Sequence, residues 1–385
     1  MQIELTKEQI EQQAHFKAFV EKSIMPDAAQ HDQQQHTPPE LIQHLAQQGY
    51  LGAIIPKEYG GGEMEAITFG LLCEQIGRAS ASLLSLLTVH GMVCQAIMRW
   101  GSAEQKQQWL PKLASGEIIG GFGLTEPNIG SDAKSIESTA IAHEDHYQLT
   151  GHKKWISFGQ VANLFLIIAQ CDNKPTALLV ERKTAGFSTK PINNLLGFRS
   201  AMLAELILND CIIPAQNLVG KIGFGFSHIA SAALDHGRYC IAWGCVGLAQ
   251  ACLEASLHYT KDRKQFGTFL SNHQLIQHMI ADMIVQIKAA RLLCYQAGYL
   301  KNNGEPALIM ETSIAKYFAS QMVSKVADNA VQIHGANGCS EEYPVQRYLR
   351  DAKIMEIIEG SSQMQQIIIA KYGYQFFLQE MRKNH

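Results

Sequence analysis

The chain has 385 residues and a net charge of −3, and only 17 % of its residues are charged. This length suggests two or three domains, or one large fold with sub-domains. Because no run of lysine or arginine stands out, we expect no nucleic-acid partner.

The cysteines and the N-terminus bear on metal binding and on location. None of the nine cysteines forms a CxxC pair, so we expect no metal site. Their odd number in a chain of this size indicates reduced thiols and a cytoplasmic protein. The N-terminal stretch MQIELTKEQIEQQ lacks the apolar segment of a signal peptide. No uninterrupted apolar run reaches about 18 residues, so we expect no membrane span.

The first 116 residues are predicted to be helical. Thr37 followed by Glu40 resembles a capping box, and Ser102 and Gly116 mark the start and end of another helix. Residues 117–225 instead contain short segments that are rich in β-formers and separated by turn residues. The clearest are HYQLTGHKKWIS, NLFLIIAQ, TALLVER and MLAELILNDCIIP. Residues 226–385 return to long amphipathic helices.

This order predicts a mainly α protein with a central β domain. The predicted domains are a helical one at 1–116, a β domain at 117–225 and a second helical one at 226–385. The order differs from the alternating βαβ pattern of a doubly wound sheet. A GxGxxG motif after a strand, GxxxxGK[ST], GxSxG and HExxH are all absent. Their absence argues against Rossmann, P-loop, α/β-hydrolase and zinc-protease sites.

Glu359 is the leading candidate for a chemical role. It follows Ile357 and Ile358 and precedes Gly360, where a helix is about to begin. The isoleucines are expected to lower the local polarity and raise the pKa of the carboxyl group, which suits a general base. The helix start offers free N–H groups to a polar ligand. On the residues alone, an exposed carboxylate at a helix start remains an open alternative.

Three other stretches suggest a flat ligand that carries phosphate. GFGLTEPNIGSD combines small and hydroxyl residues, KKWIS places a tryptophan two residues before a hydroxyl, and DRKQFG carries an arginine. Such residues can accommodate a polar ring system, stack on its face and bind phosphate. Each stretch also has an ordinary structural explanation: a polar turn, a core tryptophan and a solvated helix face.

Taken together and in order, LTEPNIGSD, KKWIS, LDHGR, DRKQFG, QIHGANG and RDAKIMEIIEGSSQMQ resemble the acyl-CoA dehydrogenase flavoprotein family over nearly the whole chain. The resemblance implies an N-terminal α-helical domain, a middle β-barrel-like domain and a C-terminal four-helix bundle. It implies a homotetramer (a dimer of dimers) or a homodimer that binds FAD. The implied reaction removes the α-proton of an acyl thioester by a base, while the β-hydrogen leaves as hydride to flavin N5.

The resemblance also implies residue roles. Glu359 matches the base, and Gly237 stands where another branch of the family carries its base. The residues matched to the flavin and its surroundings are Phe122, Leu124, Thr125, Ser131, Trp155, Ser157, Ser361 and Gln363. Those matched to the diphosphate and adenosine end of FAD, reached in part from a neighbouring subunit, are Arg263, Phe266, Gln274, Gln332 and Gly335. Those matched to the acyl thioester are Ser131, Asp235, Arg238 and Gly360.

The substrate is a finer question. DHGRYCIAWGCVGLAQAC and RDAKIMEIIEGSSQM look most like the dehydrogenases of polyketide extender-unit pathways, of the hydroxymalonyl and methoxymalonyl type. These act on short acyl groups held on an acyl carrier protein. The alternative is an acyl-CoA dehydrogenase of fatty-acid or amino-acid catabolism that passes electrons to an electron-transfer flavoprotein. An oxidase that uses oxygen directly and a non-catalytic scaffold are further alternatives.

Overall fold

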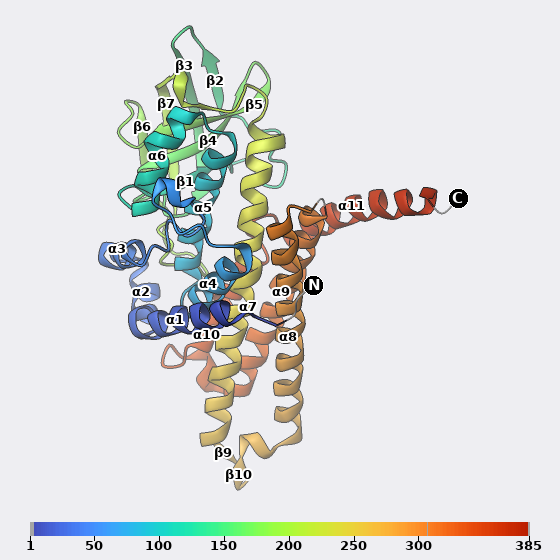
Figure 1. Cartoon of the computed structure of the whole chain (residues 1–385). Coiled ribbons are helices and arrows are strands. Elements are labelled where there is room, and N and C mark those ends of the chain that lie inside the picture. The colour runs from blue at the N-terminus through green and yellow to red at the C-terminus, as the bar shows by residue number, and fades with distance from the viewer. Residues whose placement is uncertain (1–3, 306, 384–385) are drawn as a thin grey trace.

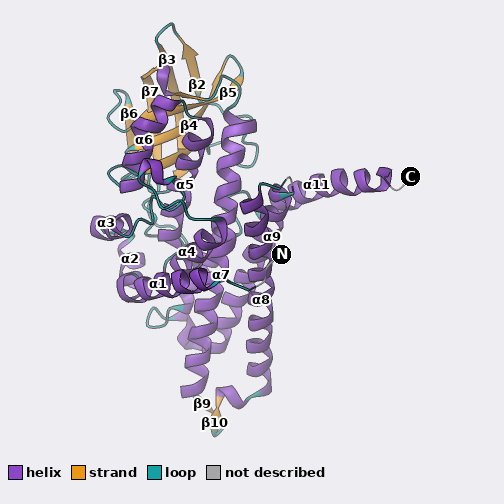
Figure 2. Cartoon of the chain, viewed as in Figure 1, coloured by secondary structure: helices purple, strands orange, loops and turns teal. Residues whose placement is uncertain are grey.

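The computed structural model describes residues 4–305 and 307–383 of the chain. Helices at the N-terminal side, a β-sheet at one end and a long helical bundle follow one another along the chain (Figures 1 and 2). The predicted class, mainly α with a central β region, is therefore confirmed.

Among the residues described, six α-helices precede the sheet. They are α1 (Lys7–Ser23), α2 (Ala28–Gln34), α3 (Pro39–Gln47), α4 (Ala66–Ala79), α5 (Ala81–Trp100) and α6 (Ala103–Ser115). The predicted ends of α6 are confirmed, since Ser102 caps its N-terminus and Gly116 ends it in the left-handed conformation. The capping box predicted for α3 is wrong. Pro38 occupies the N-cap position, and the buried Thr37 hydroxyl instead donates to the Ser200 carbonyl, 2.7 Å away.

The sheet contains eight strands in the order β6-β7-β3-β2-β4-β5-β8, with β1 parallel to β4. The four predicted β segments correspond to β3, β4, β5 and β7, whereas the short strands were not predicted. The strands are β1 (Gly120–Gly123), β2 (Thr139–Ala142), β3 (His146–Ile156), β4 (Leu164–Cys171), β5 (Lys174–Glu181), β6 (Phe187–Pro191), β7 (Ala204–Pro214) and β8 (Leu218–Val219).

The bundle is built around α7, which contacts α4, α5, α8, α9 and α10. Its helices are α7 (Ser231–Asp262), α8 (Gln274–Asn303), α9 (Leu308–His334), α10 (Val345–Met355) and α11 (Ser362–Lys383). A two-stranded hairpin, β9 (Lys264–Gln265) and β10 (Thr268–Phe269), joins α7 to α8 at the end of the bundle away from the sheet (Figure 1). Helix α11 projects sideways from the body.

Helices α4 and α7 pack with their backbones almost in contact. A Cβ added to Gly77 would lie 2.7 Å from the Gly244 Cα, closer than real Cβ atoms approach. A Cβ on Gly247 would likewise collide with the Glu74 carbonyl. Glycine is therefore required on both sides of this contact, which fixes α7 against the N-terminal helices.

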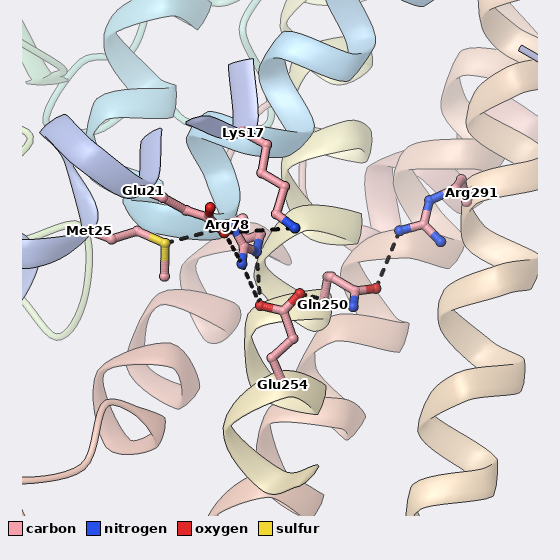
Figure 3. Close-up of polar contacts among 7 residues, drawn as sticks. All are labelled: Lys17, Glu21, Met25, Arg78, Gln250, Glu254 and Arg291. Carbon is pink, nitrogen blue, oxygen red and sulfur yellow. Dashed lines mark hydrogen bonds and ion pairs between the residues drawn. The ribbon is translucent and has the colours of Figure 1, made fainter. Parts of the chain in front are cut away.

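Polar side chains join the same helices next to this contact. Figure 3 shows Arg78 of α4 between Glu254 of α7 and Glu21 of α1, with N–O distances of 2.7 and 3.0 Å. Arg291 of α8 pairs with the buried Glu74 at 2.7 Å. The N-terminal helices are thus bound to the bundle by partly buried ion pairs as well as by close packing.

Two helical stretches, α5 and the continuous segment Gly225–Asp262, are long and apolar enough by composition to cross a membrane. The sequence expectation differs because it considered uninterrupted apolar runs, which neither helix has. Both stretches are mostly buried among the other elements, as core helices of globular proteins are.

Arg78→Met is expected to lower the free energy of unfolding by about 3 kcal/mol, because Glu254 and Glu21 then lose a cation in a partly buried site. Urea unfolding measures this loss. Lys17→Met is the control, since Lys17 is exposed and lies 3.9 Å from Glu21, and we expect a change within about 0.5 kcal/mol. Equal stability of the two variants would contradict the role given to Arg78.

Candidate active site

The segment from residue 356 to 361, here called the Glu359 turn, links α10 to α11. Glu359 and Gly360 are both in the left-handed region, with φ of 54° and 84°. Glutamate adopts this conformation only at a cost of roughly 1 kcal/mol or more. The paired left-handed residues change the chain direction between α10 and α11, and the Glu359 side chain lies against α7.

Gly237 of α7 is the residue that the Glu359 carboxylate meets. A Cβ at this position would collide with both the Oε2 and the Cδ atoms of Glu359. Oε2 is buried and has no hydrogen-bond partner among the described residues. Burial raises the pKa of Glu359 to about 7, while Arg238 and Lys316 act in the opposite direction. The carboxyl group is therefore ready to exchange a proton near neutral pH.

Ile357 and Ile358 contribute less to the raised pKa of Glu359 than the sequence suggested. Ile357 is 55 % exposed, and Ile358 is partly buried against the core. The direct contact of the carboxylate is with α7, and the sequence predicted the raised pKa correctly for a partly wrong reason.

Three side chains, of which Gln365 and Lys316 are buried and Arg238 is partly buried, hold the backbone of the Glu359 turn. Arg238 Nε donates to the Glu359 carbonyl at 3.3 Å, and Gln365 Nε2 donates to the carbonyls of Glu359 and Gly360 at 3.0 and 2.9 Å. Lys316 Nζ, from α9, donates to the Gly360 carbonyl at 2.9 Å. Sequence reasoning found Arg238 but missed Gln365 and Lys316. Gln365 lies within the quoted motif, whereas nothing in the sequence near Lys316 indicates its contact.

Asp235 lies on α7 two residues before Gly237. Its Oδ2 is 3.5 Å from the Lys301 ammonium, and its Oδ1 is buried without a partner among the described residues. Asp235 and Arg238 of α7 flank Gly237, which the Glu359 carboxylate contacts, and Gly360 follows Glu359 in the turn.

A second surface is formed where β1 leads into residues 124–126 and β3 carries a bulge between Lys153 and Ile156. We call it the β1–β3 platform. The Lys154 N–H donates to the Thr125 carbonyl at 2.9 Å, which joins the two segments. Within the bulge Trp155 has a φ of 63° and is 49 % exposed. Bulges redirect side chains in this way, and here one presents an indole ring to the outside of the sheet.

A buried ion pair supports the platform from below. Lys153, which has no exposed surface, lies 2.6 Å from Glu126 and donates to the Leu124 carbonyl at 3.2 Å. Glu126 also accepts from the Ser138 N–H at 2.9 Å. The Leu124 side chain is buried in the core, as is that of Phe122, so these residues can offer a ligand mainly their backbone. Sequence reasoning did not identify this ion pair.

The remaining predicted residues separate into two sets. Ser361 directly precedes α11, and its Oγ accepts from the Met364 N–H at 3.4 Å, whereas Gln363 and Ser131 are exposed. The others form an exposed distal group at the hairpin end of the bundle, which Figure 1 shows far from the sheet: Arg263, Phe266, Gln274, Gln332 and Gly335.

The distal group cannot reach the Glu359 turn of its own chain. At 1.5 Å per residue, Arg263 lies about 39 Å along α7 from Gly237. The loop that begins at Gly335 is bound to the same end of α7, because the Tyr259 hydroxyl donates to the His334 carbonyl at 3.2 Å and accepts from Asn337 at 2.9 Å. One subunit therefore brings together the residues around Glu359 but leaves the distal group apart.

Sequence models of three domains match the chain. They are the acyl-CoA dehydrogenase N-terminal domain at residues 6–117, the middle domain at 121–211 and the C-terminal domain at 223–373. The chain therefore belongs to the acyl-CoA dehydrogenase family. It is an FAD-dependent oxidoreductase that acts on CH–CH groups.

Individual relatives cover almost the whole chain. A probable acyl-CoA dehydrogenase of Bacillus subtilis is 39 % identical over 96 % of this chain and 99 % of its own. The butyryl-CoA dehydrogenase structure from Megasphaera elsdenii has a TM-score of 0.93 and 34 % identity, and covers 97 % of this chain and 99 % of its own. FkbI, described as serving biosynthesis of a methoxymalonyl extender unit, has a TM-score of 0.87 and 28 % identity over 94 % of this chain and 99 % of its own.

The residues present fit a flavin and a thioester. The half-exposed indole of Trp155 can lie against a ring face. The hydroxyl groups of Thr125 and Ser157 are partly exposed, and neither forms a hydrogen bond among the described residues, so both are free to bind ring edges. The unpartnered Glu359 Oε2 completes a site with donors, an aromatic face and a carboxylate.

Gly237→Ala is expected to slow flavin reduction by an acyl thioester about a hundredfold, because the new methyl group pushes the Glu359 carboxylate out of position. Anaerobic stopped-flow absorbance measures the rate in the FAD-loaded enzyme. Gly373→Ala in α11 is the matched control, since its added Cβ meets nothing within 4 Å beyond its chain neighbours and the adjacent backbone of its own helix. Equal rates in the two variants would show that the contact with α7 does not set the carboxylate position.

Proposed function

We propose that the enzyme desaturates the Cα–Cβ bond of an acyl thioester, with Glu359 as the base that removes the α-proton. The observation that carries this proposal is the buried, unpartnered Oε2 held against Gly237, with its pKa raised to about 7. Bound FAD would supply the acceptor for the β-hydrogen, which leaves the substrate as hydride. The proton then resides on Glu359, whose burial makes the neutral acid favourable.

The other residues bind and orient. Trp155, Thr125 and Ser157 on the β1–β3 platform are proposed to hold the flavin ring, with Ser361 and Gln363 at its far edge. Arg238 and Asp235 are proposed to line the path of the thioester, together with Ser131 and Gly360. Both α7 side chains lie within one helical turn of Gly237, which supports their placement beside the reacting carbons.

We propose that the distal group serves a neighbouring subunit of a homotetramer or homodimer. In one chain this group is too far from Glu359 to share a cofactor with it. Phe266 is 96 % exposed and held at a φ of 53°, an arrangement that is costly unless the ring has a partner. Exposed apolar side chains continue along α8 and α11, including Leu275 and Phe377, which supports burial of these helices in an oligomer.

CoA and an acyl carrier protein are the two candidate carriers of the acyl group. The relatives with higher identity carry acyl-CoA names, at 39 % and 34 %, and favour a CoA ester. A similar solved structure, 35 % identical, whose title names an electron transferring flavoprotein of Acidaminococcus fermentans supports such a flavoprotein as the electron acceptor. The motif-based expectation of a short acyl group on an acyl carrier protein is supported by the similarity to FkbI at 28 % identity. To distinguish the two carriers, the same short acyl group is offered to the anaerobic enzyme once on CoA and once on an acyl carrier protein. Only the form that the enzyme accepts should bleach the flavin absorbance.

Glu359→Gln is expected to retain FAD and to lose flavin reduction by at least about a thousandfold, since only the base is removed. In the wild-type enzyme the reduction rate should rise about tenfold per pH unit below a midpoint near 7 and level off above it, because the base acts when ionised. Rapid anaerobic mixing over a pH series tests both statements. Near-normal reduction by the glutamine variant would make the base assignment wrong.

Arg263→Ala is expected to weaken FAD binding about tenfold, the effect of losing one charge-assisted contact to phosphate. Flavin reduction at saturating FAD should change less than about twofold. If Arg263 binds the adenosine end of FAD, it lies far from the Glu359 that acts on the same FAD. FAD dissociation measured by ultrafiltration separates the two effects. The control is Lys261→Ala, which removes another exposed positive charge, on α7 two residues before Arg263. Unchanged FAD affinity in the arginine variant would remove this residue from the cofactor site.

A further inference from the structure

Lys316 is a buried lysine that forms no ion pair with the residues the structure describes. It lies on α9, has no exposed surface, and its Nζ donates to the Gly360 carbonyl at 2.9 Å. No carboxylate of the described residues lies within 4.0 Å of this nitrogen. The equally buried Lys153, by contrast, has Glu126 at 2.6 Å. A buried ammonium whose hydrogen-bond partner is a neutral carbonyl destabilises the fold. This cost suggests that Lys316 has a role beyond this hydrogen bond.

The groups that face Lys316 come from α7 and from the Glu359 turn. From α7 they are Arg238 and the Cys245 thiol, and from the turn they are Glu356 and Glu359. Burial raises the pKa of Cys245 to about 12, so this thiol is neutral. Of the two carboxylates, only Glu359 has an oxygen that is buried and unpartnered.

Glu356 is already engaged with other groups. Its Oε1 accepts from the Ser324 hydroxyl at 2.5 Å and lies 3.6 Å from the Lys353 ammonium. The charge of Lys316 is therefore available to Glu359, and it opposes the desolvation that raises the Glu359 pKa. Burial lowers the pKa of Lys316 itself to about 8, so the ammonium is still charged where Glu359 ionises.

The hydrogen bond to Gly360 places this charge where it also controls geometry. The Glu359 turn depends on two successive left-handed residues, and the second of them, Gly360, presents its carbonyl to Lys316. Gln365 shares the same carbonyl at 2.9 Å but brings no charge. The turn would retain one donor without Lys316, whereas Glu359 would lose a nearby cation.

We propose that Lys316 is a positioning residue for the base: its ammonium holds the Gly360 carbonyl and supplies the positive charge that lets the buried Glu359 carboxylate form. This inference rests on the proposed role of Glu359. The inference gives a residue of α9 a part in proton abstraction. This residue lies outside the sequence motif around Glu359.

The test uses Lys316→Met, which removes donor and charge, and Lys316→Arg, which keeps both. In the FAD-loaded enzyme, Lys316→Met should move the pH midpoint of flavin reduction upward by about one unit, the effect expected of one close, partly screened charge. Its plateau rate should fall about tenfold, because the turn is less well fixed. Lys316→Arg should restore the midpoint. If Lys316→Met does not fold, Lys316→Gln provides the same comparison of midpoints.

Arg78→Met is the matched control for loss of a buried cation elsewhere in the fold. It should lower stability and leave the pH midpoint of flavin reduction where it is in the wild type. A Lys316→Met midpoint equal to that of Arg78→Met would overturn the inference, since a purely structural lysine would give that result.

A second readout does not depend on turnover. Infrared difference spectra of the FAD-loaded protein without substrate follow the carboxylic-acid band that Glu359→Gln removes, and its titration midpoint should rise in Lys316→Met. If this band does not shift while Glu359→Gln abolishes reduction, the inference about Lys316 is wrong and the proposed base stands. If Glu359→Gln still reduces the flavin, the proposed function itself fails.

Discussion

The contact between the Glu359 carboxylate and the backbone of α7 at Gly237 is the constraint on which the site depends. It removes one carboxylate oxygen from water, and no described residue gives that oxygen a hydrogen bond. This desolvation moves the pKa of Glu359 toward neutrality. The contact needs α7 in a fixed place and the Glu359 turn in a fixed shape. The glycine packing and ion pairs between α4 and α7 meet the first need, and the side chains around Glu359 and Gly360 meet the second.

Two surfaces from distant parts of the chain are each stabilised by a buried lysine. On the β1–β3 platform, Lys153 has Glu126 as its counter-ion, and the pair fixes the loop beside Trp155. In the Glu359 turn, Lys316 has a carbonyl partner, and its charge acts on the Glu359 carboxylate. A buried lysine thus stabilises the β1–β3 platform, whereas in the Glu359 turn it acts through its charge. The difference is whether a carboxylate lies close enough to form an ion pair with the lysine.

Much of this arrangement could be predicted from the sequence. The change from helical to strand-like sequence patterns near residue 117, and back near residue 225, located the long strands and the helices. The apolar segment before Glu359 predicted a raised carboxyl pKa, and the proposed role of Glu359 as the base starts from it. What failed were features set by tertiary contact. Thr37 resembled a helix cap but bonds to Ser200, and the polarity around Glu359 is lowered by α7 more than by Ile357. Lys316 and the Lys153–Glu126 pair act across the fold, so local sequence carries no sign of them.

The central claim is that Glu359 takes the α-proton. The most direct test incubates the FAD-loaded enzyme in D₂O with an acyl thioester that has α-hydrogens but no β-hydrogen, so that oxidation cannot follow. Mass spectrometry then follows deuterium at Cα. The account predicts exchange with the wild-type enzyme and none above the uncatalysed rate with Glu359→Gln. Exchange at the wild-type rate in the variant would contradict it, because another group would then be removing the proton.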